Sequence, residues 1–145
     1  MRSSWRHRAR PTLLLAVSAC VGSGAVAGEA PTLWSAAEVR WGDLPGVPGA
    51  RQALLWGDPE RSDHGTLDRW PAGASIPARV APHDIHIVVF TGTLTIEIDG
   101  EEAGQFGPGS FVRIPEGARY APGCEAAGEC NFVKHVPGPE TAAGD

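Results

Sequence analysis

The clearest pattern in the chain is a strict alternation of polar and apolar side chains over residues 93–98, which ends at Asp99-Gly100. Successive side chains of a β-strand point to opposite faces, so this segment is predicted to be a strand whose Leu94, Ile96 and Ile98 face the core. Asp-Gly is a strong signal for a tight hairpin turn. The pattern therefore predicts a strand followed by a hairpin turn.

Other short segments also have strand character, with apolar or β-branched residues bounded by Gly and Pro. They are residues 50–56, 65–70, 85–90, 111–114 and 131–136. No segment shows a sustained helical period, and no internal repeat is evident. Many short strands at regular spacing predict an all-β sandwich or closed barrel.

The length of 145 residues suits one domain. We expect a lead-in over residues 28–44, whose Trp34 and Trp41 are available to pack against a sheet, and a barrel over residues 45–136. A Pro- and Gly-rich stretch follows, so residues 137–145 are predicted to be a flexible tail.

Charge is distributed unevenly along the chain. The formal net charge is −5, yet four of the twelve Lys and Arg residues lie before Pro11 and no acidic residue lies before Glu29. From Gly28 onward, eight basic residues face all seventeen acidic ones. Such a surface repels phosphate backbones, so we expect no nucleic-acid partner.

The first 27 residues have the pattern of an export signal: an Arg-rich start, then a short apolar stretch over residues 12–19. Ala25-Val26-Ala27 predicts cleavage before Gly28 and a periplasmic or secreted protein. Val17-Ser18-Ala19-Cys20 is instead similar to a bacterial lipobox, which would anchor an outer-membrane lipoprotein through Cys20. A disordered cytosolic tail is a third interpretation.

Under either cleavage, two further cysteines remain, Cys124 and Cys130, separated by five residues. An oxidising compartment would let them pair across the base of a turn. A Cys-x-x-Cys pattern of redox or zinc sites is absent. We therefore predict a structural disulfide.

Three segments resemble the cupin superfamily. PAGASIP (71–77) and IVVFTGTL (87–94) are similar to the first cupin motif, and GPGSFVRIPEG (107–117) is similar to the second. Together with VPG (47–49), LWGDP (55–59) and the cysteine pair, they resemble a branch of small, often exported, single-domain cupins. The resemblance spans about residues 41–136 and implies a double-stranded β-helix, a jelly-roll type of barrel.

The resemblance also locates the metal site of the family, which uses a His-x-His pair, a Glu and a later His. In this chain the four positions hold Arg79, Ala81, Ile85 and Tyr120. Divalent transition metals need imidazole, thiolate or carboxylate donors that converge on one point. These residues predict a degenerate site and no metal cofactor.

A displaced site is the alternative, with His83, Asp84 and His86 as ligands of a divalent transition metal. Strand alternation, however, places His86 on the face opposite Ile85, and His83 falls in a loop. His64 and His135 are isolated in the sequence and are expected at the surface.

Arg79 should point into the barrel, as the ligand that it replaces does. One hypothesis makes it an anion clamp, with the Tyr120 hydroxyl as second donor to a carboxylate, phosphate or sulfate. The other pairs it internally with an acid such as Asp84 or Glu116, because an unpaired buried charge is costly. Trp56 and Trp70 could line a pocket, although packing is the more common role of such residues.

Three functions are compatible with these features. The first is a metal-free binding or accessory module of the cell envelope that takes a small anionic ligand. The second is a metal-dependent cupin enzyme of dioxygenase, isomerase or hydrolase type. The third is a structural partner protein that forms homodimers. Serine-hydrolase, phosphate-loop and zinc-protease motifs are absent, so no catalytic residue is predicted.

Overall fold

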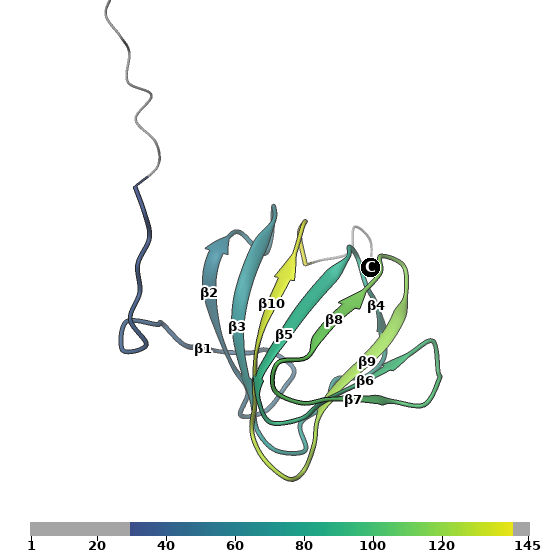
Figure 1. The fold of residues 1–145 in the computed structure, drawn as a ribbon. Coiled ribbons are helices and arrows are strands. Elements are labelled where there is room, and N and C mark those ends of the chain that lie inside the picture. Colours follow the sequence, from purple (N-terminus) through teal and green to yellow (C-terminus); the bar gives the residue numbers. More distant parts are fainter. Residues whose placement is uncertain (1–29, 141–145) are drawn as a thin grey trace, which may run out of the picture. The chain divides into compact units, whose positions relative to one another are not determined.

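A computed structural model of the chain describes residues 30–140, and its strands belong to the compact unit that begins at Trp34. Ten strands form two antiparallel sheets (Figure 1). The larger sheet has the order β1 (Gly42–Asp43), β2 (Arg51–Gly57), β3 (His64–Trp70), β10 (Cys130–Val136), β5 (Ile85–Thr91) and β8 (Phe111–Ile114). The smaller sheet has the order β4 (Arg79–Val80), β9 (Arg119–Cys124), β6 (Leu94–Ile98) and β7 (Gly104–Phe106).

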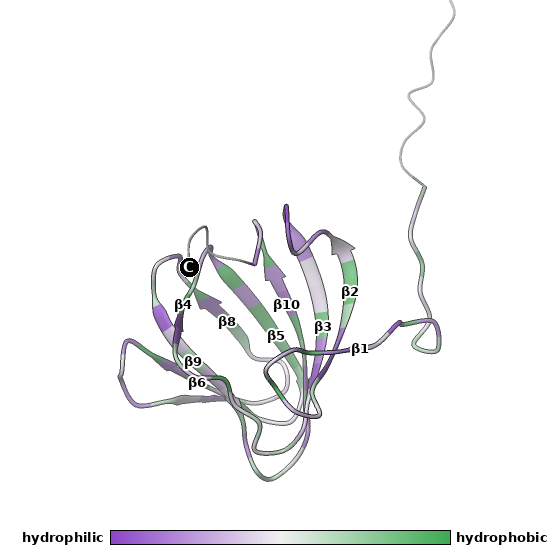
Figure 2. Cartoon of the chain, turned by 180° about the vertical axis from the view of Figure 1, so that it is seen from behind, coloured by the Kyte–Doolittle hydropathy of each residue, from purple (hydrophilic) through white to green (hydrophobic). Residues whose placement is uncertain are grey.

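Both sheets contribute side chains to one core. In β5, Ile85, Ile87 and Val89 are buried while the residues between them are more exposed, and Figure 2 shows this strand as hydrophobic bands interrupted by a hydrophilic one. Leu94 of β6 and Ile114 of β8 are fully buried in the same cluster. Full burial of such side chains contributes about 1.5–3 kcal/mol each, so the two sheets stabilise each other.

The structure confirms the all-β prediction, and between residues 30 and 140 it contains no helix long and apolar enough to cross a membrane. The six predicted strands are present with ends that differ by one residue or none. Asp99 and Gly100 take positive φ angles of 54° and 80°, as a tight turn after β6 requires. The sequence analysis did not predict β1, β4, β7 and β9.

The unpredicted β9 contains Pro122 and Gly123, both of which weaken a strand pattern. Pro122 has no N–H to donate, but its carbonyl accepts a hydrogen bond of 3.0 Å from the Ile76 N–H. A side chain at Gly123 would collide with the Thr95 hydroxyl, 2.7 Å from the position of the missing Cβ. Tertiary packing thus selects residues that strand propensity disfavours.

The predicted disulfide is present and joins the two sheets. Cys124 ends β9 and Cys130 begins β10, with a sulfur–sulfur distance of 2.03 Å. The bond therefore fixes the end of one sheet to the start of the central strand of the other.

The two ends of the described region differ in their packing. In the lead-in, the Arg69 guanidinium lies 4.5 Å from the centre of the Trp41 ring, whereas Trp34 is half exposed. Of the tail predicted to be flexible, residues 137–140 are described, and buried Gly138 accepts a hydrogen bond of 3.1 Å from His64 Nδ1. The predicted export signal with Cys20 lies outside the described residues.

Candidate functional site

A cavity of about 190 Å³ lies inside the barrel. Trp70 and Phe132 form part of an otherwise aliphatic wall, and their rings pack edge to face at 5.6 Å. The polar side chains that line the cavity are those of Asp68, Arg79, Tyr120, Lys134 and Glu140. A concave, mainly apolar space with a few polar groups is the usual form of a small-molecule site.

Arg79 and Tyr120 stand at one side of this cavity as direct partners across β4 and β9. Arg79 Nε donates a hydrogen bond of 2.9 Å to the Tyr120 hydroxyl, and its guanidinium carbon lies 5.4 Å from the centre of the Tyr120 ring. Tyr120 is buried, whereas Arg79 is exposed on the short β4. Across residues 30–140 no carboxylate forms an ion pair with Arg79, so its remaining N–H groups are available to an anion.

Arg79 pairs with neither Asp84 nor Glu116, the two acids named as examples of an internal partner, although its charge helps to lower the pKa of Glu140. Asp84 accepts a hydrogen bond of 2.9 Å from the Glu116 N–H and another of 3.0 Å from Arg113 Nε. Both contacts lower the pKa of Asp84, and the hydrogen bond from the Glu116 N–H has the larger effect. The Glu116 carboxylate lies 3.9 Å from His83 Nδ1. Both acids are thus engaged outside the cavity.

Asp68 is a buried carboxyl group in the cavity wall that the sequence analysis did not single out. Its two oxygens accept hydrogen bonds from Thr66 Oγ1 at 2.6 Å and from Gln52 Nε2 at 2.8 Å. Burial raises the pKa of Asp68, against the opposing effects of Lys134 and of these hydrogen bonds. The group is therefore polar and fixed in position, but its negative charge is disfavoured.

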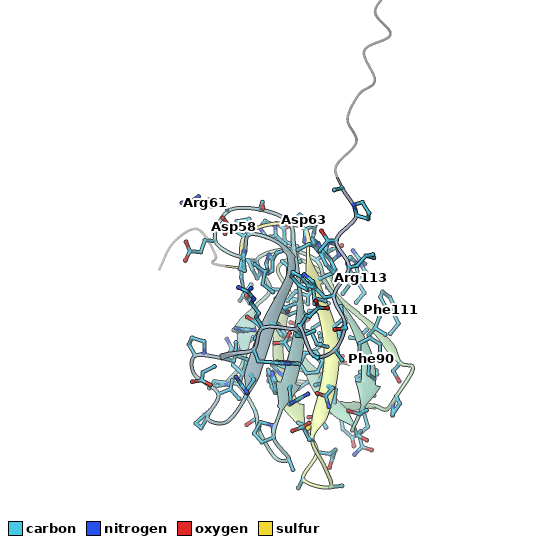
Figure 3. The ribbon with its side chains drawn as sticks, turned by 90° about the vertical axis from the view of Figure 1, so that its left-hand side faces the viewer. Asp58, Arg61, Asp63, Phe90, Phe111 and Arg113 are labelled. Carbon is cyan, nitrogen blue, oxygen red and sulfur yellow. A yellow bond between two sulfur atoms is a disulfide. The ribbon has the colours of Figure 1, made fainter. Side chains whose placement is uncertain are left out.

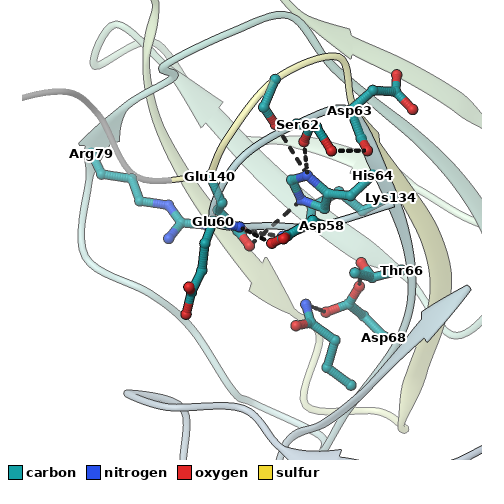
Figure 4. Close-up of polar contacts among 12 residues, drawn as sticks. Asp58, Glu60, Ser62, Asp63, His64, Thr66, Asp68, Arg79, Lys134 and Glu140 are labelled. Atoms are coloured by element: carbon teal, nitrogen blue, oxygen red, sulfur yellow. Dashed lines mark hydrogen bonds and ion pairs between the residues drawn. The ribbon is translucent and has the colours of Figure 1, made fainter. Parts of the chain in front are cut away.

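Lys134 and Glu140 form an ion pair beside His64, as Figure 4 shows. The Lys134 side chain is only 9% exposed, so its ammonium group depends on this partner. His64 was expected at the surface, and that prediction is wrong: it is completely buried, with Nε2 3.8 Å from a Glu140 oxygen. Burial follows from strand parity, because His64 shares the inward face of β3 with Thr66 and Asp68.

The alternation along β10 also marks Lys134 as a residue on the inward face of its strand. It lies two residues from Phe132 and two from Val136, all of which alternate inward along β10. Asp68 lies two residues before Trp70 in the same way on β3. Polar residues on the core face of an alternating strand are thus marked in the sequence, whereas nothing in the pattern indicated that Glu140 returns to them.

The positions at which the resemblance implies metal ligands do not fit a metal ion. Ala81 has no donor and is buried, and Ile85 presents an aliphatic side chain to the cavity. Arg79 remains protonated and Tyr120 already accepts a hydrogen bond from it. The chemistry of this set suits an anion better than a cation.

The displaced candidates His83, Asp84 and His86 are not brought together. Asp84 is bonded to Arg113, and His83 lies near Glu116. His86 faces outward from β5, as its parity predicts, and its Nδ1 lies 3.4 Å from that of His135. No group of three or more His, Cys, Asp or Glu side chains among the described residues could hold a metal ion.

His86 and His135 belong to a row of rings on the outer face of the larger sheet. His86 stacks on Phe111 at 5.9 Å and on His135 at 5.6 Å, and His135 lies 5.9 Å from Trp56. The Trp56 ring covers Gly65, where a Cβ atom would lie 2.1 Å from it. Trp56 is thus a surface residue, whereas Trp70 lines the cavity.

Comparison with sequence families gives one match over most of the chain. The family described as the ChrR cupin-like domain matches residues 29–139. No curated protein matches the chain.

Solved structures with the same architecture share little sequence with the chain. The polyketide cyclase RemF from Streptomyces resistomycificus is 19% identical, with a TM-score of 0.65 over 74% of this chain and 80% of that one. A cupin family protein of Methanocaldococcus jannaschii with a double-stranded β-helix fold is 13% identical, with a TM-score of 0.56 over 70% and 90%.

A third likeness is to the structure of Rhodobacter sphaeroides SigE in complex with the anti-sigma factor ChrR. It is 24% identical, with a TM-score of 0.56 over 70% of this chain and 50% of that one. At these identities the three structures establish the fold and nothing further.

Proposed function

The chain belongs to the ChrR cupin-like family and has the double-stranded β-helix fold of cupins, and we propose that it binds a small carboxylate in its cavity without a metal ion. The observation that carries the proposal is the position of Arg79 at the cavity, bonded to the Tyr120 hydroxyl and free of any ion pair with residues 30–140.

A carboxylate suits this arrangement for two reasons. The planar guanidinium offers parallel N–H groups that match two carboxylate oxygens, and such charge-assisted pairs are among the stronger hydrogen bonds. The apolar wall with Trp70 and Phe132 would cover the body of the ligand. Arg79 and Tyr120 are therefore the proposed ligand-binding residues.

The proposal includes the cell envelope as the place of action. The Arg-rich and apolar leader of the sequence supports export, and the Cys124–Cys130 disulfide is the kind of bond that oxidising compartments favour. The mature protein would be free in the periplasm or secreted, or would be held at the membrane through a lipid on Cys20.

Titration calorimetry with butyrate and benzoate tests the proposal, with butyramide and benzamide as neutral analogues. At least one carboxylate should bind with a dissociation constant below about 10 mM, and its amide should not. Arg79→Met should weaken binding at least tenfold, while Arg61→Met, which changes an exposed arginine that does not line the cavity, should leave it unchanged. Equal affinity in wild type and Arg79→Met, or no binding of either acid, would rule the proposal out.

Self-association is a second candidate function, favoured by aromatic side chains on the outer face. Phe90 is 51% exposed and Phe111 is 62% exposed, and Figure 3 shows both on the same side of the unit. Burying such rings against a second copy would stabilise a homodimer. Light scattering should then give twice the monomer mass, which Phe90→Ser with Phe111→Ser should halve; a monomeric wild type would refute this role.

A further inference from the structure

The cavity has a second cationic group besides Arg79, and one of the chain's own carboxylates already occupies it. Lys134 reaches the cavity from β10, and its ammonium group is paired with Glu140. Glu140 belongs to no strand; it lies just beyond β10 and is tied down by a hydrogen bond of 2.7 Å from its N–H to the Pro59 carbonyl.

His64 completes the surroundings of the Glu140 carboxylate. Its Nδ1 lies 3.1 Å from two carbonyl oxygens, those of Ser62 and Gly138. Carbonyl oxygens only accept, so Nδ1 carries a proton. Nε2 is buried without a hydrogen-bond partner and lies 3.8 Å from Glu140 Oε2. This nitrogen without a hydrogen-bond partner therefore faces the Glu140 carboxylate.

Glu140 is held there as an anion. Burial raises its pKa, but the charge of Lys134, the hydrogen bond from Lys134 and the charges of Arg79 and His64 together act more strongly, so the pKa of Glu140 is below its ordinary value. The surroundings of Lys134 and His64 therefore favour a carboxylate over a carboxylic acid.

Lys134 limits what can replace Glu140. An ammonium group with so little exposure is costly to leave unpaired. Asp68 is nearby and carries the opposite charge when ionised, but burial disfavours its charge. Glu140 can therefore leave this place readily only when another anion takes it.

We propose that the ligand is a small dicarboxylate, and that Glu140 occupies its second carboxylate subsite in the free protein. This inference rests on the proposed function. One carboxylate binds Arg79 and Tyr120, and the other displaces Glu140 from Lys134 and His64, which line or adjoin the same cavity of about 190 Å³. A monocarboxylate binds at Arg79 and leaves Glu140 in place.

Calorimetric titration of the folded full chain with glutarate and butyrate tests the inference, since the two acids differ by one carboxylate. Glu140→Gln removes the competing charge and keeps the shape. It should bind glutarate at least tenfold more tightly than wild type does, and the gain for butyrate, which has no second carboxylate to place at Lys134, should be several-fold smaller. Glu129→Gln, an exposed carboxylate, is the matched control and should alter neither affinity.

A second substitution tests whether the tighter binding of glutarate depends on Lys134. Lys134→Met in the Glu140→Gln background should abolish the tightening for glutarate and should weaken butyrate binding far less than Arg79→Met does. Because Glu140→Gln could destabilise the fold, Glu140→Ala serves as a second variant, with thermal melts to establish that each is folded. This variant should tighten glutarate binding in the same way.

The outcomes separate the two proposals. If butyrate binds through Arg79 but Glu140→Gln and Glu140→Ala bind glutarate no better than wild type, the dicarboxylate subsite is refuted and the proposed function stands. If neither acid binds any of the folded variants, the proposed function itself fails.

Discussion

Arg79 and Tyr120 are neighbours across two strands of the smaller sheet, although 41 residues separate them in the sequence. The pairing of β4 with β9 fixes their Cα atoms opposite each other, and the 2.9 Å hydrogen bond fixes the direction of the guanidinium. The cation is therefore positioned before any ligand arrives, which lowers the entropic cost of binding.

Tyr120→Phe should show how much the positioning of Arg79 contributes to carboxylate affinity. The substitution removes the hydroxyl that orients Arg79 and keeps the buried ring, so the melting temperature should change little. Carboxylate binding should weaken about threefold to tenfold, which corresponds to one lost hydrogen bond. Calorimetry with the tightest monocarboxylate measures the effect, and an unchanged affinity would show that the hydroxyl has no part in binding.

Metal content is the next prediction. Elemental analysis of the folded, processed protein should give far less than one equivalent of Fe, Mn, Ni or Zn, because Arg79, Ala81, Ile85 and Tyr120 offer no set of converging donors. A chelator should leave the melting temperature unchanged. One tightly held metal per chain that disappears in a His83→Ala, His86→Ala double variant would instead support the displaced site.

Asp84→Asn should make the protein less stable in a pH-dependent way. The Glu116 N–H and Arg113 lower the pKa of Asp84 in the folded protein, so its stabilising contribution is complete above the ordinary pKa of 3.8. That contribution is lost as the pH falls through the lower folded value. Melting curves should show a deficit for the variant that is constant at neutral pH and shrinks below about pH 4.

The control for this titration is Asp43→Asn, since the Asp43 carboxylate makes no hydrogen bond or ion pair within residues 30–140. Its melting temperature should equal that of wild type at every pH. A deficit of Asp84→Asn that persists unchanged at the lowest pH would mean that Asp84 acts through shape and not through charge.

Gly92→Ala should be strongly destabilising. Gly92 has a φ of 73°, and a Cβ atom there would lie 2.3 Å from the backbone oxygen of Glu129, which cannot move aside easily. The left-handed backbone alone costs alanine about 1–2 kcal/mol, so denaturant unfolding should show a larger loss than that. Gly128→Ala has open space around it and should cost well under half as much.

Loss of the disulfide is the fifth test. Cys124→Ser with Cys130→Ser should lower the free energy of unfolding by about 2 kcal/mol, the chain-entropy value for so short a loop. Because the bond joins the two sheets, a reducing agent should lower the melting temperature of wild type and leave that of the double variant unchanged. Equal sensitivity of both proteins to reductant would contradict this role.

Local patterns were enough to predict the strands of the core. Alternation along residues 93–98 and the apolar run at 85–90 indicate which side chains face inward, because the two faces of a strand differ in burial. The sequence does not mark β4, which has only two residues, or β9, whose Pro122 runs against strand propensity. Their pairing is set by neighbours distant in the chain.

The site was predictable only in part, for a similar reason. The resemblance to cupins drew attention to Arg79 and Tyr120, and the structure brings both to the cavity. The ion pair of Lys134 with Glu140 depends on how the chain turns after β10, and the partner of Asp84 lies 29 residues away. Neither contact leaves a periodic trace in the sequence.

The return of residues 137–140 to the barrel has a practical consequence for reagents. An affinity tag fused shortly after Glu140 could compete for Lys134, so a fusion at this place invites artefacts in any screening assay. The loop between β6 and β7, where Glu101, Glu102 and Ala103 are exposed, offers a safer insertion point for a tag or a fluorescent label.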